Sequence, residues 1–270
     1  MSARAFDFID IPERSAKPRR VGLTLARDLG VGYGEAESYM AAVGDFIDYI
    51  KIRHLFVLLM GTGPDDLVRR KVALYKRHKI DVNPGGIVFE MAVLSNAADR
   101  AFDRVAELGF TAVECSENII PLTIEEKLAH IRRAKSAGLK VMFEVGEKYP
   151  TGLFDVAQAS DEMNRLVDGG CDLLILERSL IEMCLGKAGE NPESERLIEL
   201  VERVGLDRIV FEAEASPHQV WLFNKYGPDV NLGPNLDLQI IAKLEPTRRT
   251  LSREGGYGYL IDKMKQRRSA

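Results

Sequence analysis

Cysteine and histidine are scarce in this sequence, and their scarcity argues against several kinds of site. Among 270 residues there are 3 cysteines and 4 histidines. The cysteines form no CxxC pair and are too few for a disulfide framework, so a reducing compartment is expected. The histidines are not spaced as a metal cluster, and no GxGxxG, Walker or HExxH motif is present, so neither a nucleotide site nor a zinc site is indicated.

Basic charge and long apolar segments are lacking too. The formal net charge is −4, whereas a protein that binds nucleic acid by neutralising phosphates needs a basic face. No apolar run reaches the roughly 18 residues of a membrane span, and residues 1–7 lack the apolar core of a signal peptide. We therefore expect a cytoplasmic protein that binds neither nucleic acid nor membranes and acts on a small molecule.

Short β-rich apolar runs alternate with longer amphipathic stretches from residue 21 onward. This alternation is typical of βα units around a parallel sheet, and the chain length suits a (β/α)8 barrel of about 250 residues. We predict an α/β fold, a TIM barrel, as a single domain over residues 1–270. The predicted strands are Val21–Asp28, Tyr49–His54, Asp81–Pro84, Ala112–Ser116, Lys140–Val145, Leu173–Glu177, Arg208–Glu212 and Asp229–Leu232.

The stretches between these strands have apolar residues at three- and four-residue spacing, which indicates helices. Thr123 and Glu126 match the pattern of a capping box at a helix start. Residues 1–20 are expected to form an extension that packs across the bottom of the barrel or against a neighbour, and residues 255–270 an extra helix or a tail. The predicted helices include Asp65–Lys79, Ala97–Leu108, Ile124–Ala137, Asp161–Asp168, Glu193–Val204 and His218–Lys225.

Four of the predicted strands carry a glutamate at or just before their ends. Successive glutamates are about 30 to 35 residues apart, which is one βα unit each, so all four should face one mouth of the barrel. A carboxylate at the end of an apolar strand is costly unless it is paired, hydrogen-bonded or bound to a metal. Asp28 ends the first strand in the same way, and Glu90 lies just past the third. The four glutamates are Glu114, Glu144, Glu177 and Glu212.

Magnesium is one explanation for this repetition. Mg²⁺ prefers oxygen ligands and is usually held by one or two carboxylates together with water and substrate oxygens. The remaining acids would then orient the ligands or transfer protons. Alternatively, individual glutamates only pair with Lys51, Lys148 or Arg178 at the rim of the barrel.

Other residues at the predicted mouth suit an anionic substrate. Lys51 lies inside an apolar strand, where its ammonium group can bind a phosphate or a carboxylate. Lys148 follows the fifth strand, where a general acid would reach a bound substrate. Each lysine could instead be an ion-pair partner. Backbone amides after the third and eighth strands are further candidates for anion binding, at Gly85, Gly86, Asn231 and Gly233.

Short motifs occur in a fixed order from about Arg19 to Leu251. They are Pro18–Thr24 with Asp28, Gly44–Lys51, Leu74–Lys76, Pro84–Gly86 with Phe89 and Glu90, Leu108–Phe110, Glu114–Ser116, Glu144–Lys148, Phe211–Ala213, Gln219–Trp221, Gly227–Gly233, and Glu245 with Arg248. Together they resemble the phosphosulfolactate synthase family, whose members add sulfite to phosphoenolpyruvate on the route to coenzyme M.

The resemblance implies a barrel lyase that uses Mg²⁺ and binds phosphoenolpyruvate at the strand ends, with sulfite attacking C3. It implies that the four glutamates hold or orient the metal and that Glu144 is also a catalytic residue. It further implies that Lys51 holds the substrate anion and that Lys148 protonates C2. Addition to C3 forms an enolate, which a metal and a nearby acid stabilise. A homo-oligomer is expected because barrels commonly self-associate.

The sequence departs from the family pattern on the predicted catalytic face. Ile87 replaces a threonine after the two glycines, and Glu147 replaces a lysine, so two groups suited to anions are lost. Arg53 and Arg178 are candidates to restore the positive charge as substrate-binding residues. Three hypotheses follow: a divergent synthase, a related barrel enzyme that adds a different nucleophile to phosphoenolpyruvate or another enol phosphate, and a non-catalytic, stress-associated member.

Overall fold

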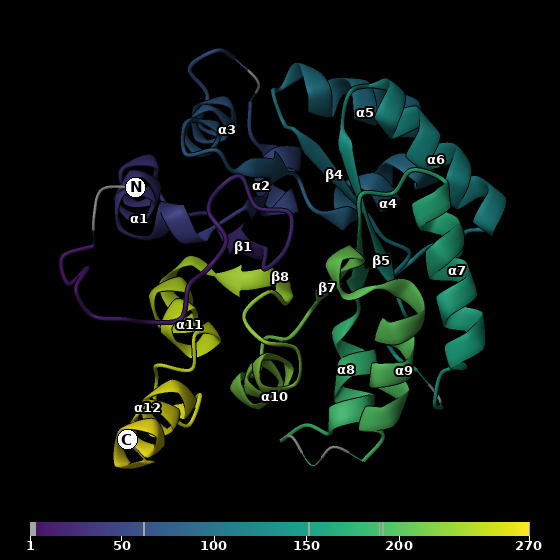
Figure 1. The fold of residues 1–270 in the computed structure, drawn as a ribbon. Helices are drawn as coiled ribbons and strands as arrows, with labels where there is room; N and C mark the ends of the chain where they lie inside the picture. The colour runs from purple at the N-terminus through teal and green to yellow at the C-terminus, as the bar shows by residue number, and fades with distance from the viewer. Residues whose placement is uncertain (1–3, 62, 151, 189, 191, 270) are drawn as a thin grey trace.

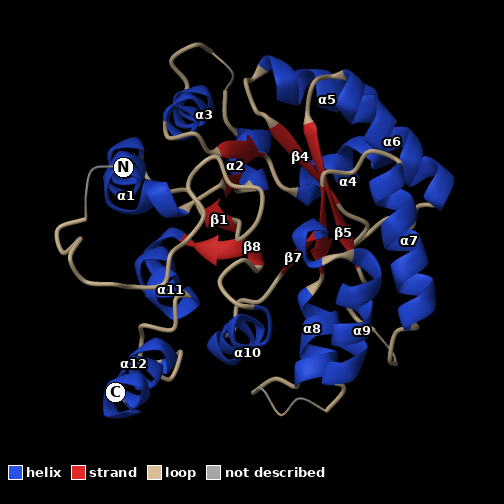
Figure 2. Cartoon of the chain, in the orientation of Figure 1, coloured by secondary structure: helices blue, strands red, loops and turns tan. Residues whose placement is uncertain are grey.

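Eight parallel strands form one sheet in the order β3-β2-β1-β8-β7-β6-β5-β4. The computed structural model describes all residues except 1–3, 62, 151, 189, 191 and 270. Helices lie around the outside of the strands (Figure 2), which confirms the predicted α/β barrel. The strands are β1 (Thr24–Asp28), β2 (Tyr49–Ile52), β3 (Asp81–Asn83), β4 (Ala112–Cys115), β5 (Lys140–Val145), β6 (Leu173–Leu176), β7 (Ile209–Phe211) and β8 (Asn231–Asp237).

Helices connect successive strands (Figure 1). The capping box of Thr123 and Glu126 is present at the start of α6. Among the described residues, no helix combines the length and apolarity needed to cross a membrane. The α-helices are α1 (Tyr33–Val43), α2 (His54–Leu59), α3 (Leu67–Arg77), α4 (Gly86–Leu94), α5 (Ala98–Glu107), α6 (Ile124–Ser136), α7 (Val156–Asp168), α8 (Arg178–Leu185), α9 (Ser194–Val204), α10 (Ser216–Tyr226), α11 (Ile241–Arg248) and α12 (Gly258–Ser269).

The two ends of the strand order, β3 and β4, meet and nearly close the ring. The backbone N–H of Thr111, just before β4, donates to the carbonyl oxygen of Val82 in β3 at 3.1 Å. In return, the Val82 N–H donates to the Thr111 hydroxyl oxygen at 2.9 Å. The strands therefore enclose a common interior, as the closed-barrel prediction requires.

Period-two alternation explains which side chains fill that interior. One buried apolar cluster consists of Leu23, Leu25, Tyr49, Ala112, Met142, Leu173, Ile175 and Val210. In six strands, a charged residue comes two positions after a member of this cluster, so the two side chains point to the same side of the strand. These charged residues are Arg27, Lys51, Glu114, Glu144, Glu177 and Glu212. These six residues, which we call the charged layer, therefore lie at the carboxyl ends of the strands, above the buried apolar cluster.

The eighth strand begins and ends later than predicted. Its expected range was Asp229–Leu232, but β8 runs from Asn231 to Asp237, through Gly233 and Pro234. Gly233 has φ 140°, and a Cβ placed there would lie 2.4 Å from the Leu25 carbonyl oxygen. Glycine is therefore required because β1 and β8 approach closely at this point.

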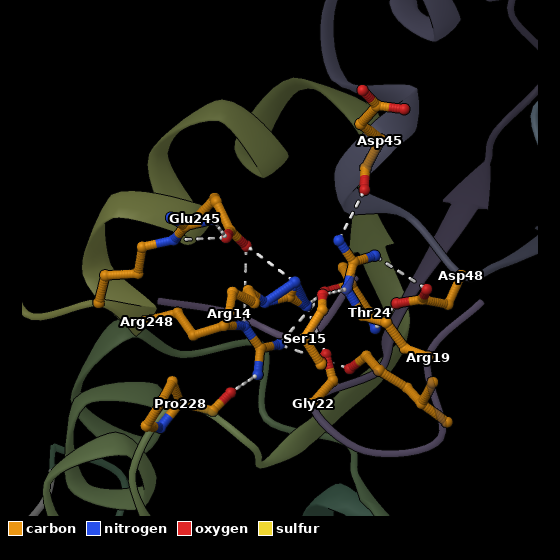
Figure 3. A network of polar contacts seen from close by, with 12 residues as sticks. Arg14, Ser15, Arg19, Gly22, Thr24, Asp45, Asp48, Pro228, Glu245 and Arg248 are labelled. Carbon is orange, nitrogen blue, oxygen red and sulfur yellow. Dashed lines mark hydrogen bonds and ion pairs between the residues drawn. The ribbon is translucent and has the colours of Figure 1, made fainter. Parts of the chain in front are cut away.

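The N-terminal segment lies across the amino-terminal ends of the strands, at the bottom of the barrel (Figure 3). Arg14 is 3.3 Å from the Glu245 carboxylate of α11, and Arg19 is 3.0 Å from the Asp48 carboxylate just before β2. Arg248 donates to the Thr24 hydroxyl at the start of β1 at 3.2 Å. These buried ion pairs and hydrogen bonds tie residues from both ends of the chain to the first strand.

Asp28, expected among the acids of the mouth, is instead a fully buried structural carboxylate. It accepts hydrogen bonds from Lys71 at 2.7 Å, from the Tyr75 hydroxyl at 2.6 Å and from the Gly30 backbone at 2.8 Å. The residue therefore joins β1 to α3.

Replacing Lys71 by methionine is expected to lower the free energy of unfolding by about 3 kcal/mol, because Asp28 would remain buried without its cation. Urea denaturation followed by circular dichroism measures the loss. The double variant Asp28→Asn/Lys71→Met should recover much of it. A loss below about 1 kcal/mol for the single variant, as for an exposed pair, would contradict a buried ion pair.

Candidate active site

A cavity of about 440 Å³ opens at the carboxyl ends of the strands. This is the end at which barrel enzymes place their catalytic groups. The cavity is lined by both signs of charge, and its lining includes Arg27, Lys51, Arg53, Gly85, Gly86, Ile87, Glu114, Ser116, Asn118, Glu144, Lys148, Glu212 and Asn235. Most of the residues predicted for the site are thus brought together here.

Three of the four predicted glutamates form a compact buried cluster. Ligand oxygens of Glu144, Glu177 and Glu212 all lie within 4.8 Å of one another, and the residues are only 8%, 2% and 4% exposed. The side chains arise from the ends of three adjacent strands, β5, β6 and β7. We call these three residues the carboxylate triad.

Three full negative charges on the triad would be energetically unfavourable. Burial, followed by repulsion from neighbouring carboxylates, raises the pKa of Glu144 to about 9. Burial and the charge of Glu177 likewise raise the pKa of Glu212 to about 7, against an opposing effect of Lys51. Strongly raised pKa values of this origin are typical of functional sites.

The triad also fits a hard divalent cation. One carboxylate oxygen of Glu177 and one of Glu212 are buried and have no hydrogen-bond partner among the described residues. A hard cation supplies what such oxygens lack, since it prefers several carboxylate oxygens and also relieves their repulsion. The residues that would hold the ion are therefore Glu144, Glu177 and Glu212.

Glu114 has a different role from the triad. One of its oxygens accepts from Lys51 Nζ at 3.2 Å and from the backbone N–H of Gly86 at 3.1 Å. A Cβ at Gly86 would come within 2.3 Å of the Ser116 hydroxyl, so glycine is needed for this close approach. The predicted glycine loop therefore positions Glu114 and, through it, Lys51.

The cationic groups lie at the rim of the cavity. Lys148 is on the loop after β5, and although burial opposes its charge, the carboxylates of Glu177, Glu144 and Glu212 raise its pKa. Arg53 follows β2, is exposed, and also lines the cavity. The cavity therefore has acidic side chains in its interior and cationic side chains at its rim, an arrangement that suits an anion bound to a metal.

Four polar residues that line the cavity were missed by the sequence analysis. Arg27 of β1 lies 2.5 Å from Asp237, and Asn235 of β8 donates a short hydrogen bond to Glu212. Ser116 and Asn118 follow β4 and both donate to the buried Glu90 carboxylate. Every second side chain of a strand points to the same side. Counting two positions on from Leu25 would therefore have predicted that Arg27 faces the mouth.

Three predicted substrate-binding residues lie outside this cavity. Asn231 is buried at the opposite end of β8, where its side chain accepts from the Leu23 N–H at 2.9 Å and donates to the Ile209 carbonyl at 3.0 Å. Gly233 lies within the same strand, against β1. Arg178, at the start of α8, is 3.6 Å from the carboxylates of both Glu182 and Glu214. Their structural contacts account for all three residues.

The fold is shared with solved barrel structures. KGPDC from Streptococcus mutans aligns with a TM-score of 0.53 over 88% of this chain and 98% of that chain, at 14% identity. A type I 3-dehydroquinate dehydratase from Clostridium difficile gives the same TM-score at 10% identity, over 90% of this chain and 98% of that one. At such identities the likeness concerns the fold alone.

Sequence comparisons are more specific. The phosphosulfolactate synthase of Methanothermobacter thermautotrophicus is 34% identical over 256 residues, which cover 92% of this chain and 95% of the relative. The enzyme of the same name from Methanocaldococcus jannaschii is 33% identical over 242 residues, or 85% and 92% of the two chains. The profile of (2R)-phospho-3-sulfolactate synthase (ComA) matches residues 12–254. This chain therefore belongs to the phosphosulfolactate synthase (ComA) family of enzymes.

Proposed function

We propose that the protein catalyses the Mg²⁺-dependent addition of sulfite to C3 of phosphoenolpyruvate, giving phosphosulfolactate for the synthesis of coenzyme M. One observation carries the proposal: Glu144 and Glu212 of the carboxylate triad line one cavity together with a set of cationic side chains. The triad suits a metal, and the cations suit a substrate with phosphate and carboxylate groups. The family membership supports the choice of reaction.

Side chains of this protein bind and orient the metal ion and the substrate. Glu144, Glu177 and Glu212 would hold Mg²⁺, which when bound stabilises negative charge that develops on the substrate carboxylate. Lys51, steadied by Glu114, binds one anionic group of phosphoenolpyruvate. An arginine at the rim suits the other, because a guanidinium binds planar oxyanions through two hydrogen bonds.

Proton transfer completes the addition. The sulfur lone pair forms the C3–S bond while the electrons of the C2–C3 double bond move toward the carboxylate, and the resulting enolate takes a proton at C2. Lys148 donates that proton, because its ammonium form is favoured by the surrounding carboxylates and its loop lies over the cavity. A positioned general acid of this kind accelerates a reaction by roughly 10²- to 10⁴-fold.

A direct assay tests the proposal. Phosphorus NMR should show conversion of phosphoenolpyruvate to a new phosphate ester only when protein, Mg²⁺ and sulfite are all present. Omission of each component in turn is the control, with mass spectrometry to identify the product. No product at any sulfite concentration would overturn the proposal.

A second candidate function is the addition of a different nucleophile to phosphoenolpyruvate. It is favoured by Leu29 and Ile87, two apolar side chains that line an otherwise polar cavity and suit a nucleophile with an apolar part. Ligands that bind the folded state raise its unfolding temperature. Protection by phosphoenolpyruvate but not by sulfite would therefore favour this candidate over the first.

A non-catalytic role is disfavoured by the triad itself. Buried carboxylates without partners destabilise a protein, and a scaffold that neither binds a metal nor turns over a substrate gains nothing from three of them. This alternative would gain if Glu144→Gln and Glu212→Gln both stabilised the protein while leaving its biological role intact.

Metal-free protein is expected to lose stability as the pH rises. The pKa values of Glu144 and Glu212 are raised in the folded state, from 4.5 to about 9 and about 7. The stabilisation from their protons is complete below pH 4.5 and is lost as the pH rises through the folded-state values. With EDTA present, the unfolding temperature should therefore fall between about pH 6 and 9.

Differential scanning fluorimetry across this range measures the effect. Glu144→Gln should flatten the pH dependence, because glutamine does not titrate. Excess Mg²⁺ should also reduce it in the unaltered protein. An unfolding temperature that rises over the same pH range in EDTA would contradict the assigned protonation of the triad.

A further inference from the structure

Arg27 and Arg53 both line the cavity at the strand ends, but they differ in how firmly they are held. The Nε–H of Arg27, in β1, donates to the Asp237 carboxylate at the end of β8 at 2.5 Å. Arg53 is exposed, and the described residues offer it no ion-pair partner. A side chain that is already fixed loses less conformational entropy when it binds a ligand. Arg27 is therefore the better prepared of the two to bind an anion.

The acidic neighbours of Arg27 occupy only part of its guanidinium group. A guanidinium has five N–H donors, and in the described part of the chain only the Nε–H makes a hydrogen bond. Nη2 is 3.7 Å from the Glu214 carboxylate, and the side chain is 26% exposed. The N–H groups of Nη1 and Nη2 can therefore bind an oxyanion in the cavity through two parallel hydrogen bonds.

Strand register places Arg27 beside Lys51. The two residues are partners in the pairing of β1 with β2, and both belong to the charged layer. Like charges on neighbouring strands destabilise a sheet, but here each cation contacts an acid on its far side. Arg27 pairs with Asp237 of β8, and Lys51 lies 3.2 Å from Glu114 of β4. The mouth thus presents two adjacent cations, each oriented by its own carboxylate.

Phosphoenolpyruvate carries two anionic groups that match this pair. Its C2 bears the carboxylate directly and the phosphate through one oxygen, so the two groups that bind them must be close together. Neighbouring strands of a sheet are about 4.8 Å apart, and side chains in register on such strands can contact both groups of one small molecule. Two cations in register therefore suit a substrate with two anionic groups on one carbon.

The surroundings of the two cations differ. Lys51 lies against the glycine loop, since a Cβ at Gly85 would be 3.1 Å from Lys51 Cδ, and backbone amides of such a loop suit a phosphate. Arg27 lies on the side of the triad, because only β8 separates β1 from β7, the strand that Glu212 directly follows. A metal at the triad would stabilise charge on the carboxylate. The phosphate is therefore expected at Lys51 and the carboxylate at Arg27.

We infer that Arg27 binds the carboxylate of phosphoenolpyruvate and that Asp237 is its positioning residue. The inference rests on the proposed use of phosphoenolpyruvate as the substrate, and it holds for either nucleophile. Asp237 acts through Arg27, because its carboxylate accepts the Nε–H and so directs the remaining N–H groups of the guanidinium toward the cavity.

Equilibrium binding tests this assignment without turnover. Isothermal titration calorimetry measures the Kd of phosphoenolpyruvate with Mg²⁺ present and sulfite absent. Arg27→Met should raise this Kd by about 10- to 100-fold, the loss expected for hydrogen bonds between charged groups, and should leave the Kd of inorganic phosphate nearly unchanged. Arg178→Met removes another arginine that contacts Glu214 but does not line the cavity. It is the matched control and should bind phosphoenolpyruvate as the unaltered protein does.

The positioning role of Asp237 has its own measurement. Asp237→Ala should raise the Kd of phosphoenolpyruvate but not that of inorganic phosphate. Asp237→Asn keeps an oxygen that can accept the Arg27 Nε–H, so it should recover part of the affinity. A merely structural role would instead change both dissociation constants together. Circular dichroism confirms that the variants fold.

The titrations also separate two kinds of failure. If Arg27→Met binds phosphoenolpyruvate as tightly as the unaltered protein, the role of Arg27 is wrong while the proposed function stands. A larger loss for Arg53→Met than for Arg27→Met, or an equal loss of affinity for inorganic phosphate in Arg27→Met, would likewise overturn the assignment. Absence of phosphoenolpyruvate binding to the unaltered protein would overturn the proposed function, and the role of Arg27 with it.

Discussion

Glu177→Gln is expected to reduce kcat/KM for the Mg²⁺-dependent reaction by about 10³-fold or more. Removing an interaction that stabilises transition-state charge costs on this order, and Glu177 is the triad residue that lies between the strands of Glu144 and Glu212. The amide keeps the shape of the carboxylate but not its charge, so it weakens metal binding without leaving a void. Initial rates over a range of Mg²⁺ concentrations measure the loss.

Stability separates this effect from misfolding. In EDTA, Glu177→Gln should unfold at the same temperature as the unaltered protein or higher, because one source of repulsion within the triad is removed. Glu125→Gln, an exposed carboxylate that is 3.3 Å from Arg165, is the matched control and should keep full activity. Activity within tenfold of the unaltered protein would refute the role of the triad.

Lys148→Met should lower kcat by about 10³-fold while changing KM for phosphoenolpyruvate little, because a general acid acts in the transition state rather than in binding. Lys148→Arg keeps the positive charge but is a far weaker acid, so it should not restore the rate. Lys225→Met, at an exposed site in the last turn of α10, is the control.

The pattern of kinetic changes decides the role of this lysine. A rise in KM with unchanged kcat would make Lys148 a binding residue. Recovery of the rate by Lys148→Arg would show that charge, rather than proton donation, is what the reaction requires.

The charged layer was the most predictable part of the site. Alternation along a strand sets the direction of every second side chain. In a barrel, the glutamates at the ends of β4, β5, β6 and β7 must therefore all face the same end of the barrel. The sequence could not divide Glu114 from the triad, because the division depends on Lys51 and the Gly86 amide, which come from other strands.

Three residues predicted to bind substrate lie outside the cavity, for two different reasons. Asn231 was expected near the carboxyl end of a strand that stops at Leu232, but β8 begins at Asn231 and continues to Asp237. That shift moved Asn231 to the bottom of the barrel and Asn235 to the mouth. Arg178 begins α8, a helix without a distinct sequence pattern, and its neighbours in space come from later parts of the chain.

Three short helices, α2, α4 and α8, were not anticipated for a related reason. Each directly follows a strand, and α2 and α4 are apolar on nearly all sides, so periodicity could not separate them from the strands before them.

The first and last strands of the chain, β1 and β8, pair with each other, and this has a consequence for the order of assembly. The Leu23 N–H, just before β1, bonds to Asn231, 208 positions later, and Arg248 reaches Thr24 across 224 positions. During synthesis, β1 can pair with β2 early, but its other edge stays open until nearly the whole chain has emerged from the ribosome. An unfinished chain therefore presents an unpaired strand edge, a template for aggregation, until the arrival of β8 seals the barrel.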